Sequence, residues 1–418
     1  MSSVAKLRLA ALSLAAALAL AALPGCVGVW GIAPAVPSEA AGTTDARTAY
    51  NRRVFDVAWD AVRRHYYDAT MHGVDWNAAR DRHRRRAEAA ADERELYDAI
   101  NEMLAELNDE HTYAATPDEV TEQRRLQGVL VGLISSPYGE DDGQRLVLDV
   151  LPGSSASAQG VRPGWVLLSV DGRPPGEVLG PGRLDAGQQV RCEFLDTTDV
   201  VRVLTLTAGA VSVAPIRTAS VMDDGVLYLR FDRFDLATAR WVRAQLKAHA
   251  RAPGIVVDLR QNPGGEALAL ARALGEFFPR SIPMGRFVRR NGRDELLRAS
   301  PGLVGARHRG AVAVLVSAAS GSSSEIFAYA IQQQKRGIVI GARTSGAVLG
   351  AETGWLPGGG ELQVSVRDYR AADGTRLEGV GVTPDIVIET RIEDLRAGRD
   401  PMLEAALEHL AGTTARPD

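Results

Sequence analysis

Residues 315–331 read LVSAASGSSSEIFAYAI, and this stretch decides the class of fold. An apolar run ends at Ser317, five serines crowd the segment from Ser317 to Ser324, and a helical pattern follows. We expect a buried strand, a polar turn and a helix. Reactive groups of α/β folds lie after a strand and before a helix. The stretch therefore raises the question of whether one of these serines attacks a substrate.

The chain keeps this organisation from about residue 211 onward. Apolar runs that indicate strands alternate with runs that indicate helices. The expected strands are GVLYLRFDRF, GIVVDLR, AVAVLVS and GIVIGA, and the expected helices are ATARWVRAQLKAHA, EALALARALGEFF and SSSEIFAYAIQQQ. This alternation, with continuously apolar strands, predicts an α/β domain over residues 211–392. The segment RDPMLEAALEHLA predicts a last helix within residues 393–418.

Within the serine cluster, Ser322 and Glu325 fit a Ser-x-x-Glu capping box, so Ser322 can simply cap the helix. A catalytic role is compatible with capping. A helix N-terminus offers unpaired N–H groups and a partial positive charge, which can stabilise the oxyanion formed when a serine attacks a carbonyl.

A second loop supports this interpretation. In VVDLRQNPGGE, Gly264 and Gly265 closely follow an expected buried strand. Adjacent glycines let backbone amides approach a ligand without obstruction by a Cβ atom. The amides of Gly265 and Ser323 would make a two-donor oxyanion hole, with Gly264 as the alternative donor. An ordinary glycine-rich turn is the alternative reading of this loop.

The composition limits the classes of function. The chain has 418 residues, 45% of them hydrophobic and 24% charged, with a formal net charge of −4. These values are ordinary for a globular protein of two or three domains. Nothing indicates the clustered basic face that nucleic-acid binding needs.

The N-terminus predicts export. Residues 1–25 contain two basic residues, an apolar Ala/Leu run and then small residues, as a secretory signal does. The signal runs into LPGC, which resembles a bacterial lipobox, so we expect a lipid on Cys26; a soluble secreted protein with a stray cysteine is the alternative. Residues 26–46 predict a tether. The one other cysteine, Cys192, is expected to be a buried apolar residue.

Two segments lie between the tether and the α/β domain. Residues 47–119 predict helices, with Leu96, Ile100, Leu104 and Leu107 on one face of the second. Residues 120–210 carry short apolar runs between Gly, Pro and Ser turns, which predict strands.

The strand-rich segment resembles a PDZ domain. The resemblance rests on VLPGS from residue 150, followed by Ala156, GV at 160, GW at 164 and VDG at 170. It implies that a peptide C-terminus adds as a strand, with its carboxylate held by backbone amides. The amide loop is expected near residues 127–130, assisted by Arg124 or Arg125. A domain that only braces its neighbours is the alternative.

Three segments together, DLRQNPGGE, SGSSSEIFA and GARTSGA, resemble the C-terminal processing peptidases, or tail-specific proteases, and their tricorn-protease relatives. The resemblance extends from Val54 through the PDZ-like segment to about Glu389. It implies a serine peptidase whose α/β catalytic domain has a crotonase-like (ClpP-like) core. The family's serine falls on Ser322.

The tail-specific branch pairs its serine with a lysine in a segment similar to GEKTFGKG, which here reads GARTSGAV from residue 341. The lysine position is Ala347 and the position of a supporting glutamine is Ala351, so this dyad is not available. Lys335 is close in sequence, but QQQKRG predicts a helix end, where a cation is favourable in its own right.

The tricorn-type branch implies a histidine and a glutamate instead. His111, in LNDEHTY, matches the family's catalytic histidine, and histidine suits a serine hydroxyl near neutral pH; a turn histidine is the alternative. The other six histidines indicate structural or solvated positions: His65, His72, His83, His249, His308 and His409.

Glu378 matches the acidic residue of the tricorn-type pattern, and we expect it to orient His111 directly or through another polar group. Asp385 is expected to cap a turn or to start a strand. Tricorn-like sites have a serine immediately before the histidine, and here that position is Glu110, whose effect stays open.

The sequence thus predicts a lipid-anchored serine peptidase of the bacterial cell envelope, with Val27 favouring an outer membrane and the periplasmic side. The PDZ-like domain is expected to engage the C-terminus of a peptide or protein substrate. No metal or organic cofactor is needed. Two alternatives stay open: a peptide-binding scaffold on an inactive peptidase fold, which Ala347 and Glu110 favour, and a hydrolase of small esters or a ligand carrier.

Overall fold

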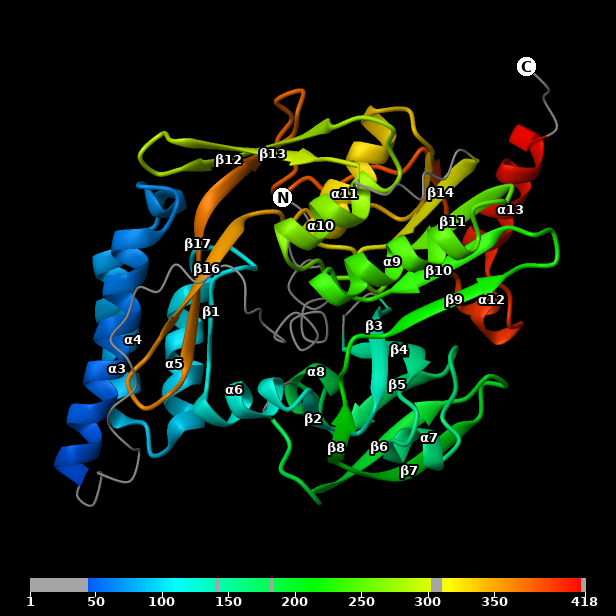
Figure 1. Cartoon of the computed structure of the whole chain (residues 1–418). Coiled ribbons are helices and arrows are strands. Elements are labelled where there is room, and N and C mark those ends of the chain that lie inside the picture. The colour runs from blue at the N-terminus through cyan, green and yellow to red at the C-terminus, as the bar shows by residue number, and fades with distance from the viewer. Residues whose placement is uncertain (1–43, 140–142, 181–182, 302–309, 415–418) are drawn as a thin grey trace.

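The computed structural model describes residues 44–139, 143–180, 183–301 and 310–414. The predicted signal peptide, Cys26, the tether as far as residue 43 and His308 lie outside these ranges. Figure 1 shows a layer of helices on one side, a small β body at one end and a larger α/β body. None of the described helices combines the length and apolarity that crossing a membrane requires.

The α/β body is built on a six-stranded sheet. In spatial order its strands are β18 (Ile386–Val387), β15 (Ile338–Gly341), β14 (Ala311–Val316), β11 (Gly254–Asp258), β10 (Leu227–Phe231) and β9 (Arg217–Val221). All neighbours pair in parallel except β9, which runs antiparallel to β10. The predicted α/β domain is confirmed.

Side chains of this sheet alternate between two covered faces, as parallel strands require. Ile255 and Val257 join the apolar cluster under α9 (Leu236–Ala248), α10 (Ala267–Gly275) and α11 (Ser323–Gln333). Val256 points to the opposite face and joins the cluster of α13 (Pro401–Thr414). The last helix therefore closes one face of the sheet, and a short helix, α12 (Ile392–Arg396), leads into it.

The strand register fixes where the chemistry lies. Asp258 pairs with Leu315, and Val316 pairs with Gly341, so β11, β14 and β15 end at one edge of the sheet. The segments that follow these three strands are the loop containing Gly264 and Gly265, the serine cluster, and the GARTSGAV segment. Loops at the carboxyl edge of a parallel sheet meet there.

The helical layer contains α3 (Thr44–His65), the short 3-10 helix η3 (Met71–Gly73), α4 (Trp76–Ala89) and α5 (Glu93–Ala105). Asp92 caps α5, because its carboxylate accepts the N–H of Glu95 at 2.9 Å. The four leucine and isoleucine positions expected on one face of α5 and just beyond it are all buried, which confirms that prediction.

A second sheet links this layer to the α/β body. Its strands are β1 (Tyr113–Ala115), β17 (Glu361–Arg370), β12 (Ile282–Arg289) and β13 (Asp294–Ala299), with β16 (Gly350–Trp355) also paired to β17. Leu356, Leu362, Val364 and Val366 enter the core of the helical layer. Residues 47–119 therefore do not pack as an independent unit, because the β16–β17 hairpin, from much later in the chain, completes their core (Figure 1).

The β body follows α6 (Pro117–Arg124) and carries its own apolar core. Its antiparallel sheet has the order β3 (Leu133–Tyr138), β4 (Gln144–Val150), β5 (Val166–Val170), β6 (Gln189–Leu195) and β7 (Val201–Thr207). Two short helices, α7 (Ser155–Ala158) and α8 (Pro175–Val178), flank it, and β2 (Gln127–Leu130) pairs with β8 (Gly209–Ser212). Cys192 is buried in this core.

Candidate active site

Ser322 lies between β14 and α11, at the N-cap of the helix. Its backbone has φ 51° and ψ −116°, a conformation that a residue with a side chain rarely adopts. Among residues 320–328 it is the one that is partly exposed, while its neighbours are buried. Backbone strain held at a partly exposed serine is typical of a functional position.

The other four serines of the cluster have structural roles. Their hydroxyls donate to backbone carbonyls of the segment after β11: Ser317 to Arg260 at 2.6 Å, Ser320 to Leu259, Ser323 to Gly265 and Ser324 to Asn262, each of the last three at 2.8 Å. These four hydrogen bonds connect the serine loop to the glycine loop. Ser322 does not take part in them, which separates it from its neighbours in a way that the sequence alone did not.

The glycine loop lies directly against Ser322. An ideal Cβ on Gly264 would lie 2.6 Å from the Cβ of Ser322 and 3.0 Å from the amide nitrogen of Ser323. The N–H of Gly264 is already donated to the side-chain oxygen of Asn262 at 2.9 Å. Within the described ranges, the N–H groups of Gly265 and Ser323 have no acceptor. The N–H groups of Gly265 and Ser323, which are the two donors of the predicted oxyanion hole, are thus available. The N–H of Gly264, the alternative donor, is already bonded to Asn262.

Glu325 has a larger role than capping. Its fully buried carboxylate accepts the N–H of Ser322 at 3.0 Å and the N–H groups of Gly346 and Ala347 at 2.7 and 2.9 Å. The hydroxyls of Thr344 and Ser345 also donate to it. Burial raises the pKa of this carboxyl, and these donors act in the opposite direction. The carboxylate ties the GARTSGAV segment to the nucleophile loop, a role that the capping-box motif did not reveal.

A lysine base is excluded by this arrangement. Ala347, at the family's lysine position, is buried, and its carbonyl accepts the N–H of Ser322 at 2.8 Å. Ala351, at the glutamine position, lines the cavity beside Ser322. Lys335 follows the far end of α11, and the rise of an α-helix puts it roughly 15 to 20 Å from Ser322.

His111 lies on the turn between α5 and β1. The backbone N–H of His111 donates to a carboxylate oxygen of Asp109 at 2.8 Å. Its backbone carbonyl accepts from the side chain of Gln363 on β17 at 3.0 Å. The second oxygen of Asp109 accepts from the hydroxyl of Thr112 at 2.6 Å, and that hydroxyl accepts the N–H of Ser365 at 3.0 Å. The turn is thus fastened to β17, and Asp109 is a site residue that the sequence did not single out.

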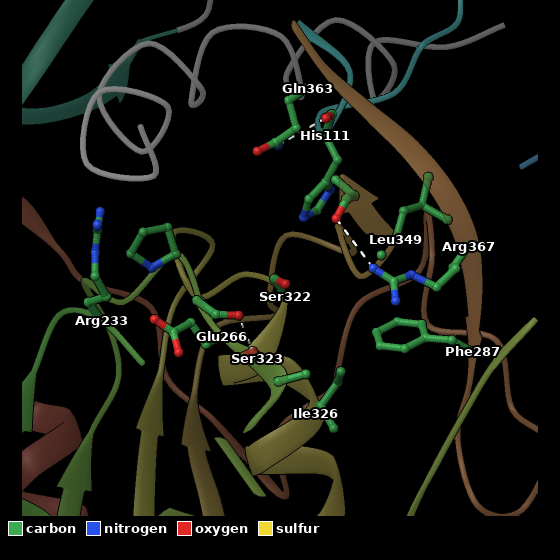
Figure 2. Close-up of a pocket in the computed structure, with 16 residues that line it drawn as sticks. His111, Arg233, Glu266, Phe287, Ser322, Ser323, Ile326, Leu349, Gln363 and Arg367 are labelled. Atoms are coloured by element: carbon green, nitrogen blue, oxygen red, sulfur yellow. Dashed lines mark hydrogen bonds between the residues drawn. The ribbon is translucent and has the colours of Figure 1, made fainter. Parts of the chain in front are cut away.

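Ser322 and His111 line the same cavity, of about 150 Å³. Figure 2 shows the imidazole of His111 above Ser322 and on the opposite side of the cavity. Among the described residues no hydrogen bond joins the two side chains, and Nδ1 of His111 is buried without a partner. Burial lowers the pKa of His111, while the charge of Asp109 raises it. Catalytic hydrogen bonds are often formed only when substrate is bound.

Glu378 does not line the cavity that Ser322 and His111 share. Its carboxylate accepts the N–H of Val348 at 2.7 Å rather than an imidazole N–H. Burial raises the pKa of Glu378 to about 8, and the charges of Asp109 and Glu325 add to the rise. Glu378 is therefore close to both the histidine turn and the nucleophile loop without a bond to His111.

The cavity has two different walls (Figure 2). One side carries Arg233 and Glu266. The other is formed by Ile326, Leu349, Phe287 and Arg367, whose guanidinium lies 5.2 Å from the Phe287 ring centroid. Arg367 is neutralised by Glu295 at 3.1 Å and by Glu352 at 3.6 Å. A polypeptide lying across Ser322 would therefore meet charged groups on one side and a mostly apolar subsite on the other.

The β body has a smaller groove beside the free edge of β3. Its lining includes Val131, Gly132 and Leu133 before and on that strand, and Leu179 and Leu184 after α8. Two details differ from the sequence prediction. Residues 127–130, expected to be the carboxylate-binding loop, form strand β2 paired to β8, because the turn that precedes β3 lies at Val131 and Gly132. Arg124 points away, since it pairs with Glu361 and stacks on Trp355.

Other histidines that the structure describes have structural contacts. His72 binds the carbonyl of Leu107 through Nδ1 at 2.8 Å, and His83 binds Glu106 at 2.8 Å. Asp385 accepts the N–H of Val339 at 2.8 Å and so fastens the start of β18 to β15. In the part of the chain that the structure describes, no group of three or more His, Cys, Asp or Glu residues could hold a metal ion.

Two family models match the chain. Residues 225–388 match peptidase family S41, and residues 48–105 match the tricorn protease C1 domain. The first covers β10 to β18 with Ser322, Gly264, Gly265 and Glu378, and the second ends shortly before His111.

Curated proteins of two kinds are similar to it. A carboxyl-terminal-processing protease of Synechocystis sp. is 28% identical over 397 residues, which are 90% of this chain and 90% of that protein. A putative tricorn protease homolog 2 of Streptomyces coelicolor is 27% identical over 399 residues, covering 85% of this chain but 32% of that longer protein.

Solved structures show the same fold. A photosystem II D1 C-terminal processing protease superposes with a TM-score of 0.59 at 25% identity and covers 86% of this chain and 97% of its own. The tricorn protease superposes with a TM-score of 0.55 at 19% identity, covering 88% of this chain and 37% of its own.

Proposed function

We propose that this chain, a serine-type peptidase with a peptidase family S41 domain, hydrolyses peptide bonds of protein or peptide substrates with Ser322 as its nucleophile. The matches confirm the expected resemblance to C-terminal processing peptidases and to tricorn protease homologues. The observation that carries the proposal is the strained, partly exposed Ser322, held with its hydroxyl outside the structural serine bonds and beside two available amides.

The chemistry follows from these positions. The oxygen of Ser322 attacks the carbonyl carbon of the peptide bond, and His111 accepts the hydroxyl proton. The carbonyl oxygen becomes an oxyanion that the amides of Gly265 and Ser323 stabilise. The C–N bond then breaks as His111 gives its proton to the leaving amine. Water, deprotonated by His111, hydrolyses the acyl-enzyme and restores Ser322.

Binding of substrate would bring the imidazole of His111 within hydrogen-bond distance of the Ser322 hydroxyl. His111 is fastened to β17, whereas Ser322 belongs to the loop above the parallel sheet, so substrate lying in the cavity would contact both. Glu378 would act on His111 indirectly. Its bond to Val348 holds the segment after Ala347, and its proximity to Asp109 connects that segment to the histidine turn.

The β body would act as a PDZ-like domain that engages the C-terminus of the substrate, and the α/β core would be of the crotonase-like type. Strand β3 is at the edge of its sheet, so a peptide could add to it as a further strand. The turn at Val131 and Gly132 supplies the backbone amides next to the groove. Since α8 has a single turn, we expect this groove to hold only the last few residues of a peptide.

The location of the enzyme is also a proposal. The sequence supports export, lipid attachment at Cys26 and a position in the bacterial cell envelope, with the outer membrane favoured by Val27. Metabolic labelling with a radioactive fatty acid would test this, with incorporation into the wild-type chain and none into Cys26→Ser. Equal incorporation into both chains would contradict it.

A peptide assay tests the catalytic proposal. The full mature chain is incubated with unstructured peptides that have either a free or an amidated C-terminus, and products are identified by mass spectrometry. We expect cleavage of both, faster for the free carboxylate, and none by Ser322→Ala. Cleavage that persists in Ser322→Ala would overturn the proposed nucleophile, and equal rates for the two peptides would argue against C-terminal recognition.

A further inference from the structure

The side of the site behind His111 holds two buried polar atoms without a hydrogen-bond partner among the described residues. These are Nδ1 of His111 and the hydroxyl of Tyr66, the residue that directly follows α3. A buried polar group without a partner costs free energy, so such atoms are rare and need an explanation. Asp109 influences both groups. Burial lowers the pKa of His111 and the charge of Asp109 opposes that effect, whereas burial raises the pKa of Tyr66 and the charge of Asp109 adds to the rise.

Asp109 is built into the site rather than exposed on a loop. Only 9% of its surface is accessible. One oxygen accepts the backbone N–H of His111 and the other accepts the hydroxyl of Thr112, which is itself bonded to β17. The carboxylate therefore cannot turn away from the histidine without breaking bonds to the same turn.

Glu378 is less suited to supply a negative charge to His111. Its carboxyl is bonded to Val348 on the nucleophile side. With a pKa raised to about 8 by burial and by neighbouring carboxylates, it holds its proton at neutral pH in this arrangement. Asp109, by contrast, accepts two hydrogen bonds from its own turn, from the backbone N–H of His111 and from the hydroxyl of Thr112.

Resting on the proposed function, we propose that Asp109 is the positioning residue of His111 and provides the carboxylate that stabilises the protonated imidazole. Glu378 then acts on His111 only through Asp109. The carboxylate that orients His111 thus belongs to Asp109, two positions earlier on the same turn.

Other charged groups around His111 come from several elements. Tyr66 directly follows α3, Glu378 lies in the segment after β17, and Glu110 belongs to the same turn as His111. Arg367 and, across the cavity, Arg233 and Glu266 face the substrate side. Arg367 is neutralised by its glutamates, and Arg233 lies beside Glu266 and Asp235. Asp109 is the carboxylate bonded to the histidine residue itself.

The test is the pH dependence of covalent inactivation. The rate at which a fluorophosphonate reacts with Ser322 is measured from pH 5 to 9 for the wild type, Asp109→Asn, Glu378→Gln and Thr112→Val. The acid limb of this profile reports protonation of the base. Loss of a neighbouring negative charge should lower the pKa of His111 by about one unit.

We expect Asp109→Asn to shift the acid limb to lower pH by about one unit and to lower the plateau rate at least tenfold. Thr112→Val, which removes the bond to Asp109 but no charge, can lower the plateau but leaves the limb in place. Glu378→Gln should also leave the limb in place. A limb that moves in Glu378→Gln but not in Asp109→Asn overturns the proposal, as does an Asp109→Asn profile that matches Thr112→Val.

A second measurement covers the case in which Asp109→Asn does not fold. The titration of His111 is followed by NMR in the wild type and in Glu378→Gln, with His111→Asn used to assign the resonances. We expect the same titration in both proteins, and a clear shift in Glu378→Gln overturns the proposal. Failure of the proposed function itself looks different, because the wild type would then show no labelling of Ser322 at any pH.

Discussion

The carboxylate of Glu325 accepts the backbone N–H of Ser322 at 3.0 Å, from one turn further along the same helix. The same carboxylate accepts the N–H of Ala347, whose carbonyl accepts the N–H of Ser322 in turn. Two loops that follow different strands of the sheet are thus joined at the nucleophile. Such a closed arrangement can hold the unusual backbone conformation of Ser322 in place.

Glu325→Gln should therefore destabilise the protein. The amide has one acceptor oxygen where the carboxylate has two, so its NH2 group must face the N–H of either Gly346 or Ala347. We expect the free energy of unfolding in urea to fall by about 3 kcal/mol. Glu404→Gln, which breaks an exposed pair with Arg399, is the control and should leave the free energy of unfolding nearly unchanged. Similar values for the two variants would contradict this role of Glu325.

Gly264→Ala should block the site. Its Cβ would lie 2.6 Å from the Cβ of Ser322, and its φ of +117° is unfavourable for alanine. We expect fluorophosphonate labelling to slow at least 100-fold, since the added methyl displaces the nucleophile and fills the space before the Ser323 amide. Gly374→Ala carries a comparable backbone penalty at φ +89° but has no atom within 4 Å, so its labelling rate should stay within about twofold of wild type. Equal slowing in both would assign the effect to backbone strain alone.

Glu378→Gln should change how stability depends on pH. The carboxyl has an ordinary pKa of 4.5 in the unfolded chain and about 8 in the folded one. Between these values the native state binds more protons than the unfolded state, so the free energy of unfolding falls as pH rises through this window. Removing the carboxyl should make the fall between pH 5 and 8 shallower, by at most about 1.4 kcal/mol per pH unit. An unchanged slope, measured by urea unfolding at several pH values, would show that Glu378 ionises normally.

Lys335→Met should leave the labelling rate unchanged. Lys335 lies beyond the C-terminal end of α11, roughly 15 to 20 Å from Ser322, and cannot reach its hydroxyl. The comparison is His111→Ala, whose rate at pH 7.5 should fall by a factor on the order of 10³. A large loss in Lys335→Met with little loss in His111→Ala would restore the lysine mechanism of the tail-specific branch.

Local patterns in the sequence were sufficient to predict the parallel sheet and its helices. Each strand is a short apolar run bounded by a turn, and each helix has apolar residues at helical spacing. The same reasoning found the serine loop and the glycine loop, since strands β11 and β14 end where polar and glycine residues begin. The resemblance to C-terminal processing peptidases and their tricorn relatives, rather than local pattern, selected His111 and Ser322, which the structure brings to one cavity.

What the sequence did not reveal depends on pairing between distant segments. The β16–β17 hairpin enters the core of the N-terminal helices, so the boundary at residue 119 does not separate two packing units. The roles of Asp109 and Glu325 were hidden because an Asx turn and a capping box are common local features. Their importance comes from partners such as Ser365 and Ala347, which lie far away in the sequence. The position of Glu378 behind the site, rather than bonded to His111, depends on the same long-range packing.

The most direct measurement is covalent labelling of the protein with a fluorophosphonate, followed by peptide mapping of the adduct. We expect a single adduct on Ser322, no labelling of Ser322→Ala, and strongly slowed labelling of His111→Ala. An adduct on another serine of the cluster, or labelling of Ser322 that does not depend on His111, would contradict the proposed nucleophile and base.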